Sequence, residues 1–75
     1  MDSDRRKSIR ERIALDGLRY ELMASPHGTN NYLGEWLCPT CDRGGTSVTS
    51  YPHVSNALDW ARGCVDCHHK AVHGG

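Results

Sequence analysis

The chain has 75 residues, of which 37% are hydrophobic and none is phenylalanine. It is long enough for one small domain, whose apolar core alone contributes little net stability. Basic and acidic side chains balance at nine each, which argues against broad phosphate binding, because that needs many cations. No segment approaches the roughly 18 apolar residues of a membrane span, and no apolar secretory segment follows the charged N-terminus. We therefore expect a cytoplasmic protein without membrane contact.

Residues 4–16 are expected to form a basic helix. Ile9 and Ile13 would lie on one face of it, and Gly17 suits the left-handed position that often ends a helix. The candidate contacts to DNA or RNA are Arg5, Arg6, Lys7, Arg10 and Arg12. The same charges would also suit a solvated helix face.

The rest of the chain, 18–75, is expected to be a zinc-binding module that forms a single domain with the helical segment 1–17. Apolar and polar residues alternate from Leu18 onward, which indicates strands. Three antiparallel strands are expected over residues 18–22, 32–37 and 46–51, and a second helix over 54–62. Gly63 either ends this helix or lies inside a longer one that runs to about residue 72.

The four cysteines form two C-x-x-C pairs, Cys38 with Cys41 and Cys64 with Cys67. Two such pairs supply the four sulfurs of a tetrahedral zinc site. A strand that leaves the first pair covers about 20 Å, and the following helix returns about 18 Å, so the two pairs are expected to meet. The sequence therefore predicts one structural zinc ion in an α+β domain, with an N-terminal helix, a three-stranded antiparallel sheet and a second helix that carries or precedes the second pair.

Residues 36–69 resemble the four-cysteine zinc domains of the zinc-ribbon and treble-clef class. The four cysteines, Pro39 and Gly63 carry this resemblance. A predicted helix precedes the second pair, whereas a plain zinc ribbon has a strand there. The order of three strands and a helix is also similar to that of compact domains that read the major groove of DNA with a sheet. That similarity concerns topology, and topology does not fix function.

The histidines leave the ligand set open. His68 lies four residues after Cys64 and could replace Cys67 in a site with three cysteines and one histidine. Otherwise His68 and His69 are expected to be exposed residues of the tail. His27, His53 and His73 show no ligand spacing, so we expect them to be solvated.

Other cysteine chemistries fit the residues less well. Two disulfides would need an oxidising compartment. The C-x-x-C-H pattern at residues 64–68 also matches c-type haem attachment, which needs export and leaves the first pair unexplained. A dithiol redox site at Cys38 and Cys41 would be expected at a strand-to-helix junction, but here two glycines and a strand follow.

The expected function is binding. Four thiolates would close the metal shell, and a catalytic zinc needs an open position, so we expect no enzymatic activity. Trp36 and Trp60 would shield the metal and complete the core. Alternatively, Tyr32 and Trp36, which share one strand face, form an exposed interaction face. We expect a nucleic-acid-associated zinc module, such as a small regulator or accessory factor. The alternative is an adaptor, or a small inhibitor of a larger machine, that binds a protein partner.

Overall fold

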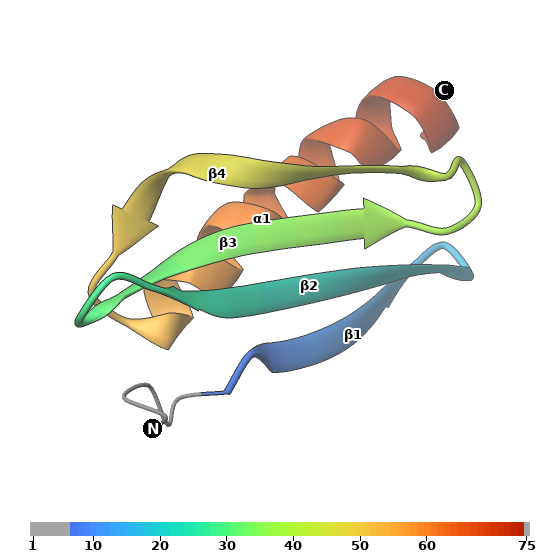
Figure 1. Cartoon of the computed structure of the whole chain (residues 1–75). Helices are drawn as coiled ribbons and strands as arrows, with labels where there is room; N and C mark the ends of the chain where they lie inside the picture. The colour runs from blue at the N-terminus through green and yellow to red at the C-terminus, as the bar shows by residue number, and fades with distance from the viewer. Residues whose placement is uncertain (1–6, 75) are drawn as a thin grey trace.

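The computed structural model describes residues 7–74, which form a four-stranded antiparallel sheet followed by one long helix (Figure 1). Each strand pairs with the next in the chain, so the sheet order is β1-β2-β3-β4. The elements are β1 (Ile9–Leu15), β2 (Leu18–His27), β3 (Asn31–Cys38), β4 (Arg43–Tyr51), the α-helix α1 (Val54–His68) and the π-helical turn η1 (His69–His73).

The predicted N-terminal helix is wrong, because residues 9–15 form the edge strand β1. Arg5 and Arg6, which were assigned to that helix, lie outside the described residues. The spacing of Ile9 and Ile13 misled the prediction. Four is an even number, so residues four apart lie on one face of a strand as well as on one face of a helix. Residues 7–74 therefore form four strands and one α-helix, instead of three strands between two helices.

The turn between β1 and β2 explains why the chain forms a hairpin here. Asp16 and Gly17 have φ angles of 51° and 83°, and Leu15 pairs with Leu18 directly across them. A two-residue turn with two positive φ values matches the twist of paired strands, and Asp-Gly is one of its preferred sequences. Gly17 is left-handed, as expected, but it turns a hairpin and does not end a helix.

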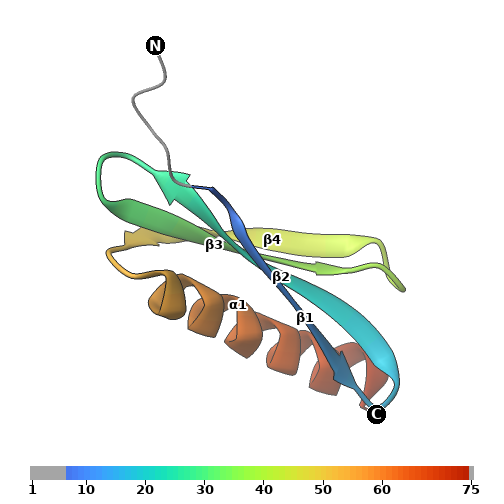
Figure 2. The same cartoon turned by 90° about the horizontal axis from the view of Figure 1, so that it is seen from below.

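The three predicted strands correspond to β2, β3 and β4, each of which extends beyond its predicted bounds. Helix α1 covers one face of the sheet (Figure 2). Ala57, Ala61 and Val65 recur at helical spacing and are fully buried, and the last two pack with Tyr20 of β2. Gly63 lies inside α1, which confirms the longer of the two predicted helices.

Helix and sheet approach each other closely at Gly34 of β3. A Cβ atom at this position would lie 2.5 Å from the carbonyl oxygen of Ala57, so a side chain would push α1 away. The pairing of β3 with β4 shifts between residues 33 and 35. The buried Ser47 hydroxyl accepts a hydrogen bond of 2.9 Å from the Gly34 N–H at this irregularity. The bulge therefore keeps its backbone donor paired without a strand partner.

Candidate metal centre

The turn between β3 and β4 presents two thiols at one end of the sheet. Cys38 is the last residue of β3 and is fully buried. The Cys41 N–H donates a 3.2 Å hydrogen bond to the Cys38 carbonyl, and Asp42 has a φ of 55°, so the chain reverses within a few residues. This tight turn holds both cysteine side chains on the same side of the loop.

The C-terminal end of the helix reaches the same end of the sheet (Figure 1). His68 ends α1 and His73 ends η1. In an α-helix, residues five apart point in clearly different directions. A π-turn, closed by i-to-i+5 hydrogen bonds, fits an additional residue into the turn, and the Gly74 N–H donates such a bond to the His69 carbonyl. The π-turn thereby brings the two rings together, with centroids 5.2 Å apart.

Two cysteines and two histidines form a cluster at this end. The ligand atoms of Cys38, Cys41, His68 and His73 all lie within 4.8 Å of one another. The His73 Nε2 lies 3.7 Å from the Cys38 Sγ and 3.1 Å from the Cys41 Sγ. Ligand bonds of zinc-like length place the corners of a tetrahedron about 3.3–3.8 Å apart. The cluster could therefore hold one metal ion with little movement of its side chains.

No protein-family model, curated protein or solved structure matches this chain. None of the helices within residues 7–74 has the length and hydropathy needed to cross a membrane.

The His68 ring gives independent support for a bound cation. Its Nε2 is buried and has no hydrogen-bond partner among the described residues, and an unpaired buried polar atom is costly. Burial, followed by the neighbouring His73, Arg43 and His69, lowers the pKa of His68. The ring is therefore neutral near pH 7, and a metal ion would satisfy its free lone pair.

The structure does not bring Cys64 and Cys67 into this cluster. They lie on α1 before His68, and among the described residues the two histidines occupy the places that the prediction gave to the second cysteine pair. His68 was considered as a ligand from the sequence. His73 was expected to be solvated, because the sequence shows no ligand spacing for it. The π-turn brings its ring next to that of His68.

The Cys41 thiol would change protonation on binding a cation. Desolvation, followed by the hydrogen bond and the charge of Cys38, raises the pKa of Cys41, whereas Arg43 lowers it. Without metal the Cys41 thiol is therefore protonated at neutral pH. A coordinated metal ion deprotonates its thiol ligands, so metal binding releases protons and strengthens as the pH rises.

A chain of hydrogen bonds connects the cluster to the β1–β2 turn. The His69 ring is largely buried and bonds through Nε2 to Asp16 Oδ2 at 2.7 Å and through Nδ1 to the Tyr20 hydroxyl at 2.7 Å. The Tyr20 hydroxyl also interacts with Cys38. Burial, followed by the charges of the nearby Cys38 and Cys41, raises the pKa of Tyr20. Partners of this kind orient metal ligands and tune their affinity.

Replacing Tyr20 with phenylalanine is expected to weaken metal binding about tenfold, because the ring still packs but Cys38 and His69 lose their polar partner. Competition with a chromophoric chelator measures the affinity. Tyr51→Phe, which removes a hydroxyl outside the cluster, is the matched control. Equal affinities for the two variants would show that the hydrogen-bond chain does not support the site.

The predicted aromatic face lies on the helix side of the sheet. Tyr32 and Trp36 are half-buried, and the Trp36 ring lies 5.1 Å from the His68 ring. The Trp36 indole nitrogen would lie 2.8 Å from a Cβ at Gly45, so the ring packs over that glycine. Trp36 therefore shields the cluster. It does not extend across the open face of the sheet, which is the face away from α1.

Proposed function

We propose that the chain is a non-catalytic zinc-binding module that binds nucleic acid with the open face of its sheet. The donor set supports zinc: two cysteines and two histidines in a tetrahedral arrangement are typical of structural zinc sites. With all four positions occupied by protein, the ion would have no open site for a substrate. Its role would be to hold the β3–β4 turn against the end of the helix.

The observation that carries the nucleic-acid proposal is the placement of three arginines. Arg10 and Arg12 are two residues apart on β1, so they lie on the same face of the sheet. Arg19 lies on β2, opposite Ala14. The pairing register places all three on the sheet face away from α1. Within residues 7–74 no carboxylate forms an ion pair with them. They offer a row of free guanidinium groups, which bind phosphates and base edges well.

Acidic side chains lie next to this row of arginines on the open face. Glu21 and Glu35 lie on the central strands, where the Ser25 hydroxyl donates a hydrogen bond to Glu35. Together with Arg10 and Leu37 they line a shallow pocket of about 390 Å³. Arg10 and Arg12 therefore carry positive charge along the β1 edge, where Lys7 is also exposed; Arg19 lies beside them on β2, and Glu21 lies opposite Arg12. We expect the phosphate backbone to follow that edge.

Fluorescence anisotropy with labelled duplex DNA and single-stranded RNA tests this proposal. In the variant R10A/R12A/R19A, affinity is expected to fall about tenfold or more at low salt, and the slope of log affinity against log salt by up to about three. Lys70→Ala is the matched control, because it removes an exposed cation from η1, away from this face. It should leave the slope unchanged.

Absence of binding to either nucleic acid at low salt, with the metal bound, would overturn the proposal. The alternative is then a protein-interaction adaptor. Its supporting observation is that Leu37, on the same open face, remains 39% exposed. A partner recovered by wild type and lost with Leu37→Ser would favour that alternative.

A further inference from the structure

Cys64 and Cys67 are two reduced thiols that the metal cluster does not use. Cys64 is half-buried and Cys67 is exposed. They are three residues apart on α1, so their side chains are neighbours on one helix face. Among the described residues, neither belongs to a group of three or more candidate ligands. The pair is therefore half of a tetrahedral thiolate site within one chain.

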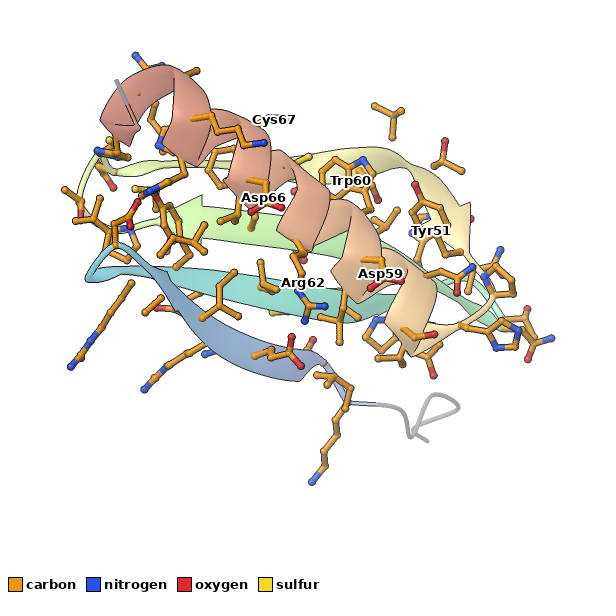
Figure 3. All side chains as sticks on the ribbon, turned by 180° about the vertical axis from the view of Figure 1, so that it is seen from behind. Tyr51, Asp59, Trp60, Arg62, Asp66 and Cys67 are labelled. Atoms are coloured by element: carbon orange, nitrogen blue, oxygen red, sulfur yellow. The ribbon has the colours of Figure 1, made fainter. Side chains whose placement is uncertain are left out.

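The surroundings of this pair suit an interface. Cys64 and Cys67 line an open hollow of about 690 Å³ together with Trp36, Trp60 and Gly63. Figure 3 shows Trp60 and Cys67 on the side of α1 toward β4, whereas Arg62 lies on the other side, where it pairs with Glu11 of β1. A Cβ at Gly63 would meet no atom within 4 Å, so the helix surface is open for close approach by another chain.

The geometry of the pair favours a metal ion over a disulfide. Residues three apart in a helix have Cβ atoms about 5–6 Å apart, whereas a disulfide needs about 3.5–4.5 Å. Closing that bond would distort α1 near its buried residue Val65. Two sulfurs on one tetrahedral zinc ion lie about 3.8 Å apart, which rotation of the side chains can reach from an undistorted helix.

We propose that Cys64 and Cys67 bind a second zinc ion together with the same pair from a second copy of the chain. A two-fold axis through the ion would double two thiolates to the four that close a zinc shell. The helices would cross near Gly63, and the two apolar hollows would face each other. The shared zinc ion supplies the contact between the copies, so the dimer is zinc-dependent.

Light scattering after size-exclusion chromatography, combined with zinc analysis, tests this inference. The wild-type chain is expected to change from monomer to dimer with added zinc and to hold about three zinc ions per two chains. Cys64→Ser/Cys67→Ser is expected to remain a monomer with about one zinc ion. Magnesium in place of zinc is the matched control and should leave the wild type monomeric, since thiolates bind it poorly.

Two results would overturn the proposal: a wild-type chain that stays monomeric at saturating zinc, or a zinc-dependent dimer that persists in the double serine variant. Thermal unfolding of that variant shows whether it retains the fold. The measurement contains no nucleic acid, so its outcome is independent of the function proposed for the open sheet face.

Discussion

Removing the metal with a chelator is expected to unfold the domain at room temperature. Among residues 7–74 the fully buried apolar side chains are few, and three of them are alanines: Tyr20, Leu22, Ala24, Cys38, Ala57, Ala61 and Val65. A core of this size supplies little net stability. A structural zinc ion contributes roughly 10–16 kcal/mol of apparent binding free energy, which is comparable with the whole net stability of a domain, about 5–15 kcal/mol.

Circular dichroism during titration with EDTA measures this effect. We expect the near-ultraviolet signal of the aromatic residues to collapse as metal is lost and to return when excess zinc is added. EDTA already saturated with zinc is the matched control, because it has the same charge and concentration but no chelating capacity. A metal-free chain with an unchanged melting temperature would show that the sheet and helix hold together without the ion.

Sequence reasoning located the sheet-forming segments after Leu18, because alternation of apolar and polar residues reports strand structure directly. It failed at β1, where the only two isoleucines of the chain have a spacing that fits both periods. The decisive signal was Asp16-Gly17, whose preference for a two-residue hairpin turn was available from the sequence. A glycine after an apolar repeat can end a helix or turn a hairpin, and only the residue before it distinguishes the two.

Part of the metal cluster, the cysteine pair of the β3–β4 turn, could be predicted from the sequence. Cys38 and Cys41 lie in a short turn, so their proximity follows from local geometry alone. Bringing a helix back to them was also foreseen, since the return distance depends on strand and helix lengths. Which helical residues would arrive at the turn could not be derived, because one α-helical turn separates Cys64 from His68. The π-turn at η1 brings His73 next to His68 at the β3–β4 turn. No residue pattern in the sequence predicts this π-turn.

Replacing His73 with alanine is therefore the most discriminating test of the ligand set. We expect the zinc dissociation constant to rise more than about 100-fold, since loss of even an outer partner costs 10–100-fold. At a fixed zinc concentration this corresponds to about 2.7 kcal/mol of lost stabilisation. For a domain of this size the melting temperature should then fall by about 10–20 °C.

Two variants make this result specific to the cluster. His27→Ala removes an exposed histidine from the end of β2 and is expected to leave both the affinity and the melting temperature unchanged. In a Cys64→Ser/Cys67→Ser background, cobalt should still give the absorption of a tetrahedral site with two thiolates, because Cys38 and Cys41 remain. If His73→Ala bound zinc as tightly as His27→Ala, while the double serine variant lost both zinc and fold, the four-cysteine site first inferred from the sequence would be the correct one.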